Sequence, residues 1–125
     1  MATLTKAFEH FDAVPTNIRY SWSAFTRDKS SLVCTLWQHE FSGKKYTLWG
    51  KTWKGGSAGW SEQRRNLDEA IEAGLPITGF VVVARDPKAG KLSVESAKID
   101  RLFHLKIVEH DHEWIVGETV GIEKQ

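Results

Sequence analysis

The chain has 125 residues, of which 41% are hydrophobic and 26% are charged, and its formal net charge is +1. This length fits one domain over residues 1–125, and no apolar run approaches the roughly 18 residues that span a bilayer, which excludes a membrane-spanning helix. The N-terminal residues lack the apolar block of a signal peptide, so we expect a cytoplasmic protein.

The near-neutral total hides an uneven distribution of charge. Residues 43–65 contain six basic residues and one acidic residue, a local charge of +5, while the rest of the chain carries −4. The same segment holds three of the six tryptophans. A basic segment on a mildly acidic body is typical of a surface that binds an anion.

The first third of the chain predicts one helix and one hairpin. Helical spacing of apolar residues predicts a short helix in residues 3–11, with Thr3 or Thr5 as its N-cap. Residues 18–25 alternate between two faces and predict a strand. Residues 31–38, SLVCTLWQ, are rich in β-formers and predict the second arm of the hairpin.

Two kinds of core residue are expected in these arms. Trp22 and Trp37 lie on the alternating strands and are the best core candidates among the tryptophans. The one cysteine, Cys34, lies in an apolar run and has no partner for an internal disulfide, so we expect a buried and inert thiol.

Residues 46–53, YTLWGKTW, predict a third strand. Helical spacing of the aromatic residues is the alternative, but the glycines and the Thr and Trp content favour a strand. On a strand, Trp49, Lys51 and Trp53 would share one face.

A flexible connection and a second helix follow. Residues 54–59, KGGSAG, predict the connection, and Ser61 can cap a helix over residues 62–74. The apolar residues of this helix form one stripe that we expect to be buried: Leu67, Ala70 and Ile71.

The last third predicts strands only. Residues 77–86 are mostly apolar at both odd and even positions, so both faces of the strand are apolar. This pattern predicts a central strand covered on both faces. A turn at residues 86–91 and a strand over residues 91–96 follow, and residues 101–110 and 113–120 predict a hairpin. The whole order predicts an α+β fold, with a strongly curved antiparallel or mixed sheet, or partial barrel, of about six strands and two helices.

Basic residues interleaved with aromatic rings suit a nucleic-acid surface, since Lys and Arg neutralise phosphates and rings stack on bases. The candidate binding residues are Lys44, Lys45, Trp49, Lys51, Trp53, Lys54, Trp60, Arg64 and Arg65, with Trp22 and Tyr46 as pocket residues. The competing interpretation is that the tryptophans are core and the lysines keep an edge strand soluble.

No motif predicts catalysis or a bound metal. Residues 109–113, EHDHE, have a His-x-His spacing but too few further ligands, so we expect solvated turn residues, no metal and no cofactor. His39 and Glu40 are the remaining acid–base pair, and Asp86 before a proline is a turn cap. Nucleophile motifs, a P-loop and the dinucleotide glycine pattern are absent from the sequence, so we predict a binding protein rather than an enzyme.

The series YSWSAF, TLWQHEF, RRNLDEAIEAG and FVVVARD resembles a group of short bacterial proteins over residues 8–110, and that group supplies no activity. More distantly, the aromatic-rich early strands are similar to the PUA-like superfamily, which includes EVE, YTH and SRA modules. This resemblance implies a module that binds RNA or DNA and holds a modified base in an aromatic pocket. It implies a pocket lined by Trp22, Trp49, Trp53 or Trp60, with the six basic residues of the segment guiding the backbone.

The alternative function is a protein-binding module, such as a phage or mobile-element inhibitor of a bacterial complex that handles nucleic acid or defence. Trp, Tyr and Arg are also the residues that dominate protein interfaces, so the same segment serves this hypothesis. Salt dependence separates the two functions, because phosphate contacts give a steep slope and a tryptophan-centred interface gives a shallow one.

Overall fold

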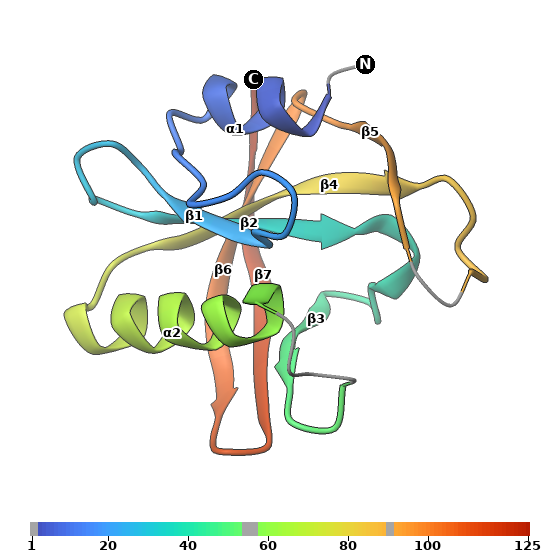
Figure 1. Cartoon of the computed structure of the whole chain (residues 1–125). Coiled ribbons are helices and arrows are strands. Elements are labelled where there is room, and N and C mark those ends of the chain that lie inside the picture. The colour runs from blue at the N-terminus through green and yellow to red at the C-terminus, as the bar shows by residue number, and fades with distance from the viewer. Residues whose placement is uncertain (1–2, 54–57, 90–91) are drawn as a thin grey trace.

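The computed structural model of the chain describes residues 3–53, 58–89 and 92–125. In these residues, seven strands form one sheet and two α-helices pack against it (Figure 1). The elements are α1 (Leu4–His10), β1 (Ser23–Phe25), β2 (Leu32–Trp37), the short 3-10 helix η1 (Gln38–Glu40), β3 (Lys45–Gly50), α2 (Ala58–Ala73), β4 (Ile77–Ala84), β5 (Val94–Ala97), β6 (Arg101–His110) and β7 (Trp114–Lys124). The predicted α+β class and element order are confirmed.

The sheet is mixed and curls into a half-barrel. Its strand order is β1-β2-β4-β6-β7-β3, and β5 pairs with β4 outside this path. β2 and β4 run parallel, whereas every other pairing among the described strands is antiparallel. The two predicted hairpins, β1–β2 and β6–β7, are both present.

A different helix covers each face of the sheet, with the strands β1, β2 and β4 between them (Figure 1). α2 belongs to the larger core, which contains the fully buried Leu32, Leu36 and Leu67. α1 belongs to the smaller core on the opposite face, which contains Phe8 and Phe80. The rings of Phe8 and Phe80 meet edge to face, with centroids 5.2 Å apart.

β4 is the central strand. It pairs with β2 along one edge and with β5 and β6 along the other. All of its residues except Val83 are buried, which confirms the prediction of a strand covered on both faces.

α1 begins where the sequence predicts and ends early. The Thr3 side chain accepts a hydrogen bond from the backbone N–H of Lys6, which confirms Thr3 as the N-cap. Asp12 adopts a left-handed conformation with φ 58°, so the chain leaves the helix two residues after His10.

The prediction of a strand over residues 18–25 is corrected by the structure. Only the last three of these residues form a strand, β1. Asn17 holds the backbone of this segment in a turn. Its side chain accepts a hydrogen bond from Arg19 N, and its carbonyl accepts hydrogen bonds from Tyr20 N and Ser21 N. Asparagine readily forms such turns, so residues 17–21 fold back instead of extending.

The third strand also ends earlier than predicted. β3 stops at Gly50, where a Cβ would lie 2.5 Å from the Trp114 ring and 2.7 Å from the Trp53 ring, so only glycine fits. The backbone then turns, with Trp53 N donating to the Gly50 carbonyl. Trp49, Lys51 and Trp53 therefore do not share one strand face.

α2 confirms the predicted helix with two corrections. It begins at Ala58, so Ser61 lies inside the helix and is not its N-cap. Leu67 and Ala70 are buried and Ile71 is half-buried, but Glu62 and Gln63 are buried as well. The rest of the predicted connection, residues 54–57 with Lys54, and residues 90–91 of the predicted turn lie outside the described residues.

Cys34 is buried, as predicted. Burial raises the pKa of its thiol to about 12, and a hydrogen bond with the Gln63 side chain opposes that rise only in part. The thiol therefore stays protonated and inert near neutral pH.

Neither of the two helices that the structure describes is long and apolar enough to cross a membrane.

Candidate functional site

The tryptophans near Gly50 tie α2 to β3. Trp49 Nε1 donates to the Trp60 carbonyl at 3.1 Å, and Trp60 Nε1 donates to the Gly50 carbonyl at 2.9 Å. The two rings lie 4.9 Å apart between centroids, and Trp49 is only 4% exposed. The structure therefore corrects the prediction that Trp49 stacks on a base, because its ring is packed inside the protein.

Trp22 and Trp53 are half-buried and form a second ring pair, with centroids 6.0 Å apart. Trp22 also presses on α2 at Gly59, where a Cβ would lie 2.7 Å from its indole nitrogen. Trp22 and Trp37 were expected to be the best core residues, but both are half-buried while Trp49 is buried. We call Trp22, Trp49, Trp53, Trp60 and Trp114 the tryptophan cluster.

Arg64, beside the tryptophan cluster, pairs with an acid of its own helix and contacts the β6–β7 turn. Arg64 Nε lies 2.9 Å from Asp68 Oδ2, and its Nη1 donates to the Asp111 carbonyl at 2.7 Å. The guanidinium also covers the Trp49 ring at 4.8 Å. The backbone N–H of Lys51 donates to the backbone carbonyl of Glu113, in the same β6–β7 turn. Folding thus brings residues 109–113, which contain three acidic residues, beside the basic segment through contacts with backbone carbonyls, whereas Arg65 stays exposed on α2.

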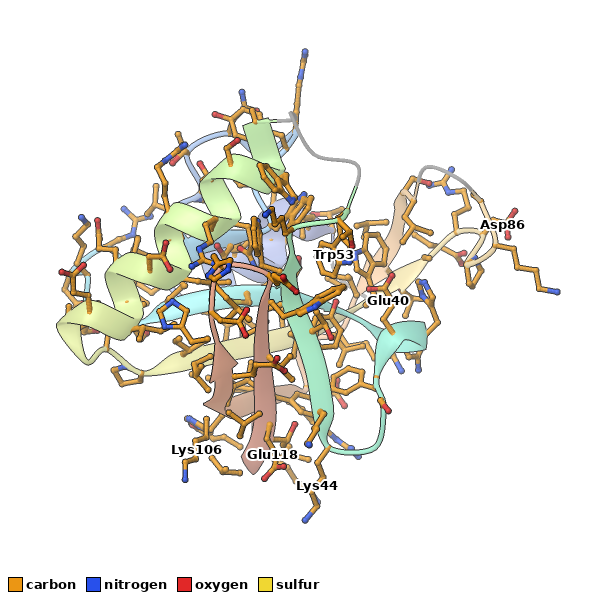
Figure 2. The ribbon with its side chains drawn as sticks, turned by 90° about the horizontal axis from the view of Figure 1, so that it is seen from below. Glu40, Lys44, Trp53, Asp86, Lys106 and Glu118 are labelled. Atoms are coloured by element: carbon orange, nitrogen blue, oxygen red, sulfur yellow. The ribbon has the colours of Figure 1, made fainter. Side chains whose placement is uncertain are left out.

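The remaining predicted residues lie at the other end of β3. Figure 2 shows Lys44 and Trp53 at opposite ends of this strand. Lys44 and Lys45 are exposed, and Lys45 pairs with Glu118 of β7. The predicted site is therefore split between two ends of a six-residue strand, a separation of roughly 15–20 Å.

A pocket forms where two strands share one edge of β4. β6 pairs with Ile77–Gly79 and β5 pairs with Val82–Ala84. The chain between them, residues 98–100, is held at this point because Lys98 N donates to the Val81 carbonyl at 2.8 Å. A pocket of about 330 Å³ lies beside this segment, within the size range of small-molecule sites.

The pocket combines an aromatic wall with a charged rim. Phe41, Phe103 and Val81 supply apolar surface, and the two rings lie 5.7 Å apart between centroids. The polar lining residues are Gln38, Lys98, Asp100 and Arg101. Asp100 Oδ2 is 3.9 Å from Arg101 Nε, so one carboxylate faces two cations and the rim is net positive.

Tyr46 supports the wall from behind. Its ring lies 5.1 Å from Phe41, and it is 5% exposed, so this predicted pocket residue does not line the pocket. Its hydroxyl accepts a hydrogen bond from Trp37 N at 2.9 Å. Burial raises the pKa of Tyr46, which keeps the hydroxyl neutral.

A wider hollow of about 850 Å³ lies against α1 and shares Lys98 and Asp100 with the pocket. Lys6, Glu9 and His10 of α1 line its other side.

The histidines do not form a catalytic constellation. His104 and His110 contact Glu123 and Asp68 at 3.1 and 2.9 Å. In residues 3–53, 58–89 and 92–125 no histidine also hydrogen-bonds a serine, threonine or cysteine side chain, and no three potential ligands gather at a metal-binding distance. Asp86 acts as the predicted turn cap, accepting from Lys88 N at 3.0 Å.

The pocket residues are not among those predicted from the sequence, although the sequence carries a signal for them. Residues 98–103, KIDRLF, interleave cations with apolar residues much as residues 43–54 do. Phe41 could not be joined to them, because the η1 connection gives no periodic pattern that predicts its neighbours.

The fold and the pocket define a small α+β half-barrel with an aromatic, positively rimmed pocket. No family model, curated protein or solved structure matches the chain, so the resemblance to PUA-like modules stays a prediction.

Proposed function

We propose that this protein is a nucleic-acid-binding module that holds one base in the pocket between η1, β4 and β6. The observation that carries the proposal is the union of an aromatic wall, Phe41 and Phe103, with a cationic rim, Lys98 and Arg101. Stacking on a ring is available to every base, and a neighbouring cation neutralises the phosphate.

The polar groups of the pocket complement this chemistry. The Gln38 amide can both donate to and accept from the edge of a base. Asp100 lies against Arg101 and can orient its guanidinium, whose planar donors suit a phosphate.

The tryptophan cluster supports nucleic-acid binding less well than the pocket. Arg64 is already paired with Asp68 and hydrogen-bonded to the β6–β7 turn, and Trp49 is packed inside the protein. We therefore place the base at the pocket and not between the tryptophans.

Fluorescence anisotropy with labelled single-stranded and duplex oligonucleotides of DNA and RNA tests the proposal. Replacing Lys98 and Arg101 together by alanine should weaken binding and lower the salt slope by roughly two, about one for each lost phosphate contact. Phe103→Leu should weaken binding by about fivefold or more with little change in slope, because stacking releases few counterions.

Lys106→Ala is the matched control. Lys106 is exposed on the same strand, β6, does not line the pocket, and pairs with Glu118 of β7, which lies beside it in Figure 2. Its loss should leave affinity within about twofold of the wild type. If the folded protein binds no DNA or RNA at low salt, or if the pocket variants behave like the control, the proposal is refuted.

The second candidate function is protein binding through the tryptophan cluster. The half-buried Trp22 and Trp53 form a ring pair, and tryptophans are enriched among the residues that dominate protein interfaces. This candidate predicts a partner whose binding is lost in Trp53→Ala and changes little with salt.

A further inference from the structure

We infer that the ligand is a single strand of nucleic acid, which has one nucleotide in the pocket and continues over residues 98–100 into the hollow against α1. The inference rests on the proposed function and adds the class of nucleic acid and the path of its backbone.

The pocket and the hollow against α1 are neighbours with shared lining residues. Lys98 and Asp100 line both of them, so the short segment that carries these residues is their common wall. The segment is held down by the bond from Lys98 N to the Val81 carbonyl, and the Asp100 carbonyl accepts from Gln125 N at 2.9 Å. A chain that leaves the pocket across this wall therefore enters the second hollow directly.

The second hollow, against α1, is lined by side chains that suit a nucleotide. Lys6 and His10 are exposed and line it from α1, and Ile99 supplies apolar surface. An ammonium group suits a phosphate, and an imidazole ring can stack on a base. The His10 ring is braced by Phe11, which meets it edge to face with centroids 4.8 Å apart. Glu9 and Asp100 are the acids that line this hollow, alongside Lys6 and Lys98.

The shape of the site selects a single strand. The pocket wall can stack only on a base whose face is free, whereas the bases of a duplex are covered by their neighbours. Lys6 and His10 line the second hollow and not the pocket, so we expect them to add affinity for a longer strand and little for a mononucleotide held in the pocket.

Competition anisotropy with deoxyadenosine 5′-monophosphate and with deoxyadenylate dinucleotide, tetranucleotide and octanucleotide tests the inference, with an octamer duplex for comparison. In the wild type, affinity should rise at least about tenfold from mononucleotide to tetranucleotide, since each further stacked base contributes. The double variant Lys6→Ala and His10→Ala should lose most of that gain and leave mononucleotide binding within about twofold.

Lys88→Ala is the control, because Lys88 is an exposed cation in the turn after β4 and lines neither hollow. If affinity does not rise with length, if the α1 variant matches the control, or if the duplex binds as well as the single strand, the inference fails. The proposed function survives those results as long as Lys98→Ala with Arg101→Ala still weakens binding. Loss of all binding in the wild type would instead refute the function itself.

Discussion

Glu62 has a buried side chain with an unsatisfied oxygen. Its side chain is 4% exposed, and Oε1 has no hydrogen-bond partner within the described part of the chain. Because a buried polar atom without a partner costs free energy, Glu62→Met should raise the free energy of unfolding by about 1–2 kcal/mol. Urea denaturation measures the change, with Glu72→Met on the exposed face of α2 as the control. A destabilised Glu62→Met protein would show that the carboxylate makes a favourable interaction.

Leu67 is the opposite case, a residue whose burial the helical stripe predicts. It is fully buried in the core that α2 shares with β2. Leu67→Ala should cost about 2–5 kcal/mol, since it removes apolar contacts and leaves a cavity. Urea denaturation should show Glu72→Ala close to the wild type. A loss below about 0.5 kcal/mol for Leu67→Ala would contradict the observed orientation of the helix.

At the scale of elements, the sequence pattern predicts the helices and strands in which buried residues recur at regular intervals. β4 and the β6–β7 hairpin follow from apolar runs and alternation, and they are confirmed. The misplaced ends have causes that periodicity does not contain: the Asn17 turn shortens β1, and β3 ends at Gly50, opposite the first residue of β7, Trp114. The first cause is local, whereas the second depends on a residue that is distant in sequence.

The β6–β7 turn gives a prediction at the same scale. Asp111 Oδ1 accepts hydrogen bonds from the backbone N–H groups of Glu113 and Trp114 at 2.8 and 2.9 Å. The bonds from Trp114 and Glu113 lower the pKa of Asp111 below its ordinary value. A carboxyl group with a lowered folded-state pKa stabilises the fold above its unfolded pKa, and this stabilisation is lost as pH falls through the folded pKa.

The melting temperature of the wild type should therefore exceed that of Asp111→Ala by its full margin above about pH 5. The margin should shrink as pH falls below about 4, because both proteins then lack the ionised carboxylate. Thermal melts of the two proteins across this range measure the margin. A margin that does not change with pH would mean that the turn does not depend on the charge of Asp111.

At the scale of the whole molecule, the site could not be predicted because it is made by strand order. The pocket exists because β5 and β6 share one edge of β4, a pairing that joins Val81 to residues about twenty positions later. The same order sets the acidic β6–β7 turn beside Lys51 and Arg64, whose positive charge is prominent in sequence. The composition predicts a cationic and aromatic surface. The order of the strands determines where cationic and aromatic residues come together.

The two ends of β3 give the last prediction. If the cations of the tryptophan cluster are neutralised by the acidic turn, then Lys51→Ala and Trp53→Ala should each leave oligonucleotide affinity within about twofold of the wild type, and the salt slope should not change. Lys98→Ala with Arg101→Ala should lower both, since their rim holds one carboxylate against two cations. Anisotropy titrations at several salt concentrations compare the three proteins, and thermal melts confirm that each is folded. A slope lowered by Lys51→Ala, together with affinity lost in Trp53→Ala, would move the nucleic acid to the tryptophan cluster and contradict its placement at the pocket.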